Sequence, residues 1–298
     1  MTGGKKMRNT KDPVPRRHEN VRRFIRATLS RRLTRFALIG VCFFILIAVF
    51  APWISPYDPD EVSFMERLQG SSPAHWLGTD TFGRDILSRL IYGTRVSLLV
   101  GVLSTTVSAV IGTLLGMCCA YFKGIVDTII MRICEAFRAI PPVMISVVLI
   151  ALLGNDMWDM TLIMGLTAVP TYIRMMRASV LSVTGSDYVL AARLQGESSF
   201  RIMFRHLLPN SISPILVIMT QSVGVAIMAE SGLSFLGLGI SVPTASWGTM
   251  LNDAKAYLLQ LPLYAVAPGL AITLLVLCLN LLGDGLRDAM DPRLRGEL

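Results

Sequence analysis

Residues 187–210 read DYVLAARLQGESSFRIMFRHLLPN, a basic and partly polar passage between two strongly apolar segments. Ser186 is a favourable N-cap for a helix that begins at Asp187, and the acid of Asp187 suits the positive end of the helix dipole. Gly196 is a typical helix stop, because a helix commonly ends on a residue in the left-handed conformation. The passage therefore begins with a short helix that is predicted to turn at a glycine.

A second short helix is predicted from about Ser198 to Leu208, ended by Pro209. Each helix has apolar residues at helical spacing, so each is predicted to be amphipathic. These residues are Val189, Leu190 and Leu194 in the first helix and Phe200, Met203, Phe204 and Leu207 in the second. Such a pair of helices either rests on the membrane surface or inserts into a groove on a soluble partner.

The composition indicates a membrane protein. Of the 298 residues, 53% are hydrophobic and only 16% are charged, whereas about a quarter is usual in soluble domains. The net charge of +8 is concentrated in residues 1–35, which hold twelve Lys/Arg against Asp12 and Glu19. This basic segment directly precedes an apolar run, which favours an interaction with anionic lipid at the cytoplasmic surface over nucleic-acid binding.

Six apolar segments are long enough to be read as membrane spans. The first, residues 36–54, has nineteen residues without a charge, which corresponds to a helix of roughly 28 Å. The others are residues 96–122, 127–153, 161–177, 211–236 and 265–282. In the second span, Gly112 and Gly116 either allow close approach of another helix or are merely tolerated there. The fold class is therefore all-α, an integral membrane protein with six transmembrane helices.

Charged residues inside these spans suggest specific roles. Arg132, Glu135 and Arg138 precede a proline kink at residues 139–142, and their spacing predicts ion pairs in a network that faces the protein interior. Glu230 lies deep in the fifth span, near its outer end. It is predicted to have a structural hydrogen-bonding role, with a proton site as the alternative.

The distribution of basic residues predicts the topology. One face of the membrane receives 21 Lys/Arg and the other receives five, so both termini and residues 187–210 are expected in the cytoplasm. The predicted parts are a basic cytoplasmic segment 1–35, a first transmembrane helix 36–54, an extracytoplasmic loop 55–95, a permease-type core 96–288 that includes the loop 186–210, and a cytoplasmic tail 289–298.

The cytoplasmic passage also resembles a known family. Its pattern Ala191-Ala192-x-x-x-Gly196, followed by Arg205-His206-x-Leu208-Pro209-Asn210, is similar to the coupling motif of ABC-transporter permease subunits. Leu190 stands where that family has an acid, a departure that its peptide-permease branch commonly shows. The resemblance implies that the passage contacts ATPase subunits through a set of residues: Asp187, Ala191, Ala192, Gly196, Phe200, Phe204, Arg205, His206 and Pro209.

The outer loop and two later stretches resemble the dipeptide/oligopeptide/nickel permeases. The matching stretches are His75-Trp76-Leu77-Gly78-Thr79-Asp80, Gly83-Arg84-Asp85-x-x-Ser88-Arg89, Glu230-Ser231-x-Leu233-Ser234-Phe235 and Ser246-Trp247-Gly248. The charges of Asp80, Arg84, Asp85 and Arg89 alternate in sign, which favours local ion pairs over a merely solvated loop. We expect this loop to form a gate or docking surface through His75, Gly78, Asp80, Arg84, Asp85 and Arg89.

The resemblance implies a type I ABC importer permease in the bacterial inner membrane. Its partners would be a homologous second permease subunit in a heterodimer, two cytoplasmic ATPases, an extracytoplasmic solute-binding protein and membrane lipid, with no nucleic acid. The chain itself would hold no cofactor, because Mg-ATP binds to the ATPases. Di- or oligopeptides are the implied substrates, with nickel chelates, glutathione or opines as alternatives.

Two other function classes fit the sequence less well. The sequence lacks GxxxxGK[ST], GxSxG and HExxH, and its three histidines are scattered, so a catalytic function is not expected. An ion-coupled secondary transporter is the other alternative. Such proteins usually show repeated halves and broken helices around a central site, and neither feature is evident in the sequence.

Overall fold

The computed structural model describes residues 31–290. The predicted segment 1–35 therefore lies almost wholly outside the described residues, as does the tail from residue 291. The long helices are α2 (Arg32–Ile54), α3 (Ile86–Phe122), α4 (Gly124–Ala139), α5 (Pro142–Leu153), α6 (Met157–Val183), α10 (Ser213–Leu233) and α12 (Pro262–Met290). Within the described range the chain forms no strand, only one isolated bridge between Thr79 and Asp85.

Shorter helical elements lie between the long ones. They are η1 (Phe64–Glu66), α7 (Asp187–Leu194), α8 (Ser199–Arg201), η2 (Ile202–Leu207), α9 (Leu208–Ser211), η3 (Ser234–Leu238), α11 (Trp247–Ala254) and η4 (Lys255–Tyr257). The elements η2 and η3 are π-helical, whereas η1 and η4 are 3₁₀ helices.

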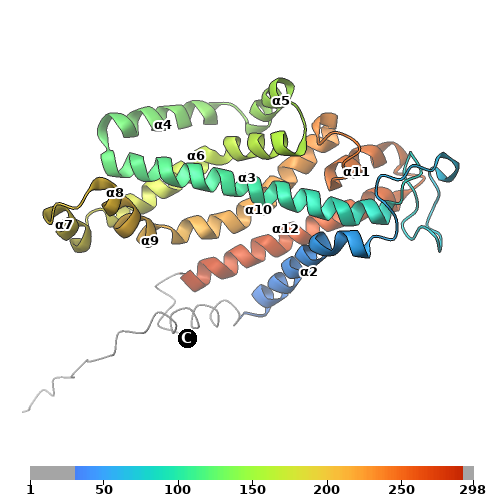
Figure 1. Ribbon diagram of the computed structural model, residues 1–298, viewed down its shortest axis with the longest axis horizontal. Helices are drawn as coiled ribbons and strands as arrows, with labels where there is room; N and C mark the ends of the chain where they lie inside the picture. Colours follow the sequence, from blue (N-terminus) through green and yellow to red (C-terminus); the bar gives the residue numbers. More distant parts are fainter. Residues whose placement is uncertain (1–30, 291–298) are drawn as a thin grey trace, which may run out of the picture.

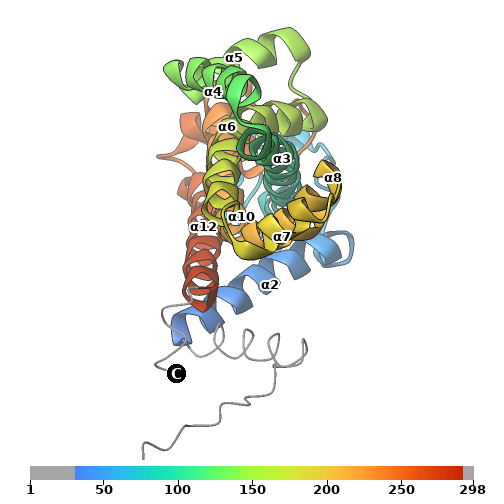
Figure 2. The ribbon, with the colours of Figure 1, turned by 90° about the vertical axis from the view of Figure 1, so that its left-hand side faces the viewer.

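The long helices run side by side and hold two groups of loops at opposite ends of the molecule (Figure 1). Helices α3 and α6 pack along each other in the centre, while α2 and α12 lie against each other on one side. Helices α4 and α5 cover the opposite side. The end-on view places α7 and α8 together at one end of the bundle (Figure 2), and the loop before α3 lies with α11 at the other.

The predicted spans are present as helices, several of them longer than expected. By length and composition α2, α3, residues 213–238 and α12 are suited to cross a membrane. The bent pair α4–α5 is apolar enough to count as a fifth crossing if its two helices form one span. Helix α6 coincides with the predicted fourth span but is not among these candidates. Helix α3 begins ten residues before the predicted span, because the Asp85 carboxylate accepts from Ser88 N at 2.7 Å and caps the helix.

The predicted kink in the third span is a complete break. Helices α4 and α5 meet at 92°, with Ile140 and Pro141 both in extended conformations between them. Proline disfavours a helical conformation in the residue before it, and two consecutive prolines impose this twice. The break therefore separates α4, which runs along the bundle, from α5, which lies at 92° to α4 and packs on α6.

Close packing of α3 against α6 depends on small residues. A Cβ atom at Gly112 would collide with Tyr172, and one at Gly116 would lie 2.5 Å from the carbonyl oxygen of Ile173. Of the two alternatives for these glycines, close approach of a second helix is the one that the structure has. Since α6 leads directly into residues 186–210, this contact fixes the position of that loop.

Candidate functional site

The first half of the loop 186–210 follows the sequence prediction closely. Helix α7 begins at Asp187 with Ser186 as its N-cap residue, although the Ser186 hydroxyl donates to Val183 O at 2.5 Å instead of capping the helix. Gly196 has a φ of +74°, so the predicted left-handed conformation is confirmed. Its N–H donates to Arg193 O at 3.0 Å, which closes the turn.

The second half differs from the single helix that was predicted. Residues 199–201 form α8, with the Ser198 hydroxyl accepting from Arg201 N at 3.4 Å, and a π-helical turn then runs from Ile202 to Leu207. Pro209 does not end the helix: it lies in the first turn of α9, where its missing N–H is not needed. The wider π turn keeps the backbone helical up to that proline.

Burial separates the two faces of the loop. Val189, Ile202 and Leu207 are at most 1% exposed and pack with Met176 and Val180 of α6. The prediction that Val189 shares an apolar face with Leu190 and Leu194 is therefore wrong. Adjacent residues of a helix point about 100° apart, and α7 buries the side that carries Val189.

The outward side carries an unusual set of apolar residues. We call Leu190, Leu194 and Phe200 the coupling surface; their side chains are 58%, 82% and 70% exposed. Tyr188 is also 40% exposed. Leu190 and Leu194 were not among the predicted contact residues, although their spacing of four residues is a signal for a shared face. Large exposed apolar residues on a well-anchored helix favour a protein contact.

The predicted contact residues are divided between surface and core. Ala192 is buried, while Phe204 is half-buried and packs on the same core. The exposed members are Asp187, Ala191, Gly196, Phe200, Arg205 and Pro209. His206 holds the loop together, since its Nε2 lies 2.9 Å from Glu197 Oε2.

The C-terminal end of α3 also supports the loop. The Arg193 guanidinium lies over the Tyr121 ring at 5.2 Å, and Tyr121 OH donates to the Ser199 hydroxyl at 3.2 Å. One tyrosine thus contacts both halves of the loop. The orientation of the coupling surface is therefore tied to α3 and α6 together.

A second cluster lies at the opposite end and joins the outer loop to α3. Asp80, Arg84, Asp85 and Arg89 are each at most 4% exposed, so the alternative of a solvated loop is wrong. Asp80 accepts from Arg84 Nε at 2.6 Å and from the backbone N–H groups of Phe82 and Arg84. The predicted local ion pairs are present, and they are buried.

Arg89 ties this cluster to distant segments. Its Nη1 donates to Pro59 O at 3.0 Å and to Pro243 O at 3.4 Å, and it lies 3.3 Å from Asp60 Oδ1. Asp253 on α11 lies 3.9 Å from Arg84, and burial raises the pKa of its carboxyl above the ordinary value. The outer loop, α3 and the segment before α11 are thereby held as one unit.

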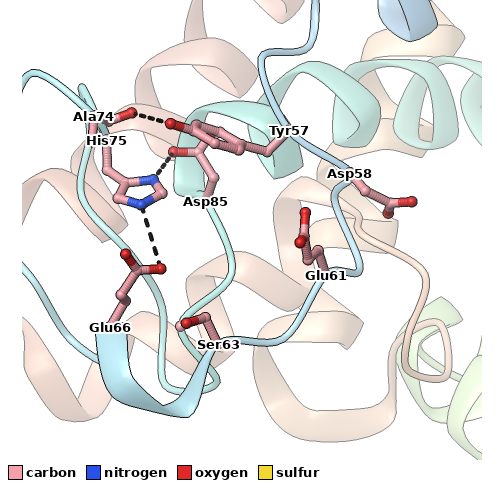
Figure 3. A pocket seen from close by; sticks show the side chains of 9 residues that line it. Tyr57, Asp58, Glu61, Ser63, Glu66, Ala74, His75 and Asp85 are labelled. Atoms are coloured by element: carbon pink, nitrogen blue, oxygen red, sulfur yellow. Dashed lines mark hydrogen bonds and ion pairs between the residues drawn. The ribbon is translucent and has the colours of Figure 1, made fainter.

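His75 and Asp85 border a shallow acidic pocket beside the cluster (Figure 3). The Nδ1 of His75 lies 2.9 Å from Asp85 Oδ1, and its Nε2 lies 3.9 Å from Glu66. The Tyr57 ring packs on the imidazole, with ring centroids 4.9 Å apart. Gly78 has a φ of +85°, and a Cβ there would collide with Gln69 O. All six predicted outer residues therefore have structural contacts in this region.

The two intramembrane acids have opposite environments. Glu230 is fully buried and accepts from the hydroxyls of Ser234 at 2.7 Å and Ser246 at 3.0 Å, which is the predicted kind of role. Arg132 and Glu135 form an ion pair of 2.8 Å, but their side chains are 77% and 58% exposed. The predicted interior network is therefore wrong for this chain alone, because α4 turns that side away from the bundle.

Comparison with known proteins gives a consistent picture. Residues 112–296 match a family described as binding-protein-dependent transport system inner membrane component, and residues 20–70 match the N-terminal transmembrane domain of oligopeptide transport permease C. A glutathione transport permease of Pectobacterium atrosepticum is 41% identical over 92% of this chain and 91% of its own length. A dipeptide transport permease of Alkalihalophilus pseudofirmus is 39% identical over 89% and 88%.

A solved structure shares the fold. An inward-facing methionine ABC transporter includes a chain that superimposes with a TM-score of 0.58, covering 69% of this chain and 98% of that one. The identity is 16%, so this comparison supports the arrangement of helices alone.

Proposed function

This chain belongs to the family of binding-protein-dependent transport system inner membrane components, and on that basis we propose that it forms half of the pathway of an ATP-driven importer for di- or oligopeptides. It is a multi-pass membrane permease subunit of an ABC transporter and is itself not an enzyme. The peptide assignment is supported by the dipeptide and glutathione permeases that it resembles along almost their whole length.

The observation that carries this proposal is the coupling surface. Leu190, Leu194 and Phe200 are exposed on a loop whose opposite side is fully buried against α6. An amphipathic helix that lays its apolar face into a groove is a common mode of protein recognition. We assign the groove to one of two cytoplasmic ATPase subunits, which bind Mg-ATP in place of this chain.

The mechanism follows from the rigid connection between this surface and the bundle. When the ATPases close on ATP, the loop moves with them. Helices α6 and α3 move with the loop, because Val189, Ile202 and Leu207 are buried in one core cluster with residues of both helices. Movement of these helices against a homologous second permease subunit would alternate access to the pathway. Both termini are then cytoplasmic, and the outer loop with its buried cluster is available to an extracytoplasmic solute-binding protein.

The test is reconstitution of the complete transporter in lipid vesicles. With the second permease subunit, both ATPases and the binding protein present, we expect ATP-dependent accumulation of alanyl-alanine or of glutathione. Omission of this chain should abolish accumulation, and the ATPases should co-purify with it. Accumulation of neither peptide by an assembled, ATP-hydrolysing complex would disprove the peptide assignment.

A further inference from the structure

Helix α4 contacts the rest of the molecule along one narrow face. The Asp127 carboxylate accepts from Arg177 of α6 at 2.6 Å through both of its oxygens. Cys134 is buried, and Ile130 packs against the small cluster to which it belongs. Residues 127, 130 and 134 follow helical spacing, so most of the circumference of α4 is left uncovered by this chain.

The uncovered circumference has two flanks of different chemistry. The polar flank carries Thr128, Arg132 and Glu135, which follow one another at spacings of four and three residues. The apolar flank carries Val126, Ile129, Ile133 and Phe137, which are between 40% and 55% exposed. At 100° per residue these flanks lie on opposite sides of the buried face, so α4 meets two different environments.

Two arginines close to the place where the end of α4 meets α6 have no ion-pair partner among residues 31–290. At 100° per residue Arg138 lies between the buried face and the polar flank of α4. Arg138 lies in the last turn of α4 and is exposed. Arg174 of α6 is half-buried and directly follows Ile173, which packs in one cluster with Cys134, one helical turn before Arg138. Arg132 is balanced by Glu135, so Arg138 and Arg174 leave two positive charges uncompensated.

The depth of these charges rules out a lipid-facing position. Arg138 lies fourteen residues beyond Gly124, which corresponds to about 21 Å along the helix at 1.5 Å per residue. Charges that face lipid are costly and are found toward a protein interior or a water-filled cavity. A guanidinium group carries N–H donors in a fixed planar arrangement that matches a carboxylate.

We propose that the polar flank of α4 faces the transport pathway and that Arg138 and Arg174 form a subsite for a carboxylate of the transported solute. The apolar flank then faces lipid. This inference rests on the proposed function, because the pathway is the space between this chain and a second permease subunit. A peptide always carries such a carboxylate at its C-terminus unless it is modified, which makes the subsite suited to the whole substrate class.

The first experiment tests the orientation of α4 with two adjacent residues. Thr128→Cys and Ile129→Cys are made separately in a cysteine-free chain and assembled into the complete transporter. A membrane-impermeant maleimide should modify the first variant and leave the second unmodified, because only the polar flank meets water. Equal modification of both, or modification of position 129 alone, would overturn the orientation.

The second experiment tests the carboxylate. For this experiment the single cysteine is Ala139→Cys, an exposed position next to Arg138 and on the same flank as Thr128. In the detergent-purified complex without binding protein, alanyl-alanine should slow maleimide labelling of this cysteine more than alanyl-alanine amide does. The concentration of alanyl-alanine that gives half-protection should rise about tenfold in Arg138→Gln or Arg174→Gln, as expected for the loss of one charge-assisted hydrogen bond. Arg138→Lys should restore part of the effect. Equal protection by the acid and the amide would overturn the subsite.

A third measurement separates the subsite from a subunit contact. If the arginines instead pair with acids of the second permease subunit, Arg138→Gln should release that subunit on size-exclusion chromatography, and this result would overturn the proposal. Retention of all subunits together with the shift in protection supports it. Failure of the wild-type complex to accumulate any peptide would count against the proposed function, whereas the labelling contrast between positions 128 and 129 would still stand.

Discussion

The Nε2 of His206 lies 2.9 Å from Oε2 of Glu197, so an ion-pair or hydrogen-bond contact joins the turn after α7 to the π-helical segment η2. Both side chains are mostly buried, at 25% and 20% exposure. Glu197 N also donates to Ala192 O at 3.1 Å. In the loop 186–210, which we call the coupling loop, this side-chain contact thus joins the two halves at the position where the backbone reverses.

Glu197→Ala is expected to loosen this loop by about 1 kcal/mol, the usual contribution of one partly buried hydrogen bond. ATP hydrolysis should continue, while the amount of peptide accumulated per ATP falls. Glu197→Gln keeps a hydrogen-bonding group and should retain most of the coupling. The measurement is the ratio of uptake to hydrolysis in vesicles; an unchanged ratio in the alanine variant would show that the contact has no role in coupling.

Gly196→Val is expected to strain the backbone at the turn, because a φ of +74° costs a residue with a Cβ roughly 1–2 kcal/mol. No atom lies within 4 Å of the Cβ position, so the effect is conformational and not steric. Gly185→Val is the matched control, since Gly185 has equally open surroundings and no positive φ. Co-purification of the ATPases should fall in the first variant only; an equal fall in both would refute the conformational explanation.

Phe200→Asp is expected to weaken the ATPase contact strongly, because it places an unpaired charge in an apolar groove. Phe200 is a cleaner probe than Phe204, which packs on the core and would disturb folding as well. Leu259→Asp provides the control, since Leu259 is fully exposed at the other end of the bundle. Co-purified ATPase should be lost in Phe200→Asp alone, with normal membrane insertion of both variants.

Local chemistry explains why several local features of this chain were predictable. The left-handed turn at Gly196 and the break at Pro141-Pro142 follow from the backbone properties of glycine and proline, which act without tertiary partners. The buried ion pairs around Asp80 were predictable in kind from alternating charges. Their burial was not, since it requires Arg89 to reach Pro59 and Pro243, and contacts this distant in sequence leave no periodic signal.

The predictions that were wrong depend on tertiary packing. Val189 and Leu190 are equally apolar, and only the position of α6 decides that Val189 is buried and Leu190 exposed. The ion pair of Arg132 and Glu135 was predictable from spacing. The direction in which it points depends on how α4 docks through Asp127, and a single chain offers no partner on that side.

The predicted orientation in the membrane can be tested with two exposed positions at opposite ends. Met65 is 94% exposed in the outer loop, and Gly185 is exposed beside the coupling loop. Each position receives a single cysteine in a cysteine-free chain. An impermeant maleimide is added to cells whose outer membrane has been removed and whose inner membrane is intact, and it should modify position 65 only. Position 185 should react after the membrane is opened; the reverse pattern would invert the topology.

Asp80→Asn is expected to destabilise the outer end of the bundle more than any other single change in this region. Asp80 is fully buried and accepts from Arg84 Nε and two backbone N–H groups, with Arg89 Nε 3.6 Å away. Removing its charge leaves two buried guanidinium groups poorly compensated, which typically costs about 3–5 kcal/mol.

Asp253→Asn is the graded control for this prediction. Asp253 is more exposed than Asp80, and its contact with Arg84 is longer, at 3.9 Å. We expect a clear fall in the thermal unfolding midpoint and loss of binding-protein-stimulated ATPase activity in Asp80→Asn, with a smaller effect in the control. Equal stability of both variants would mean that the buried cluster does not hold the outer loop on α3.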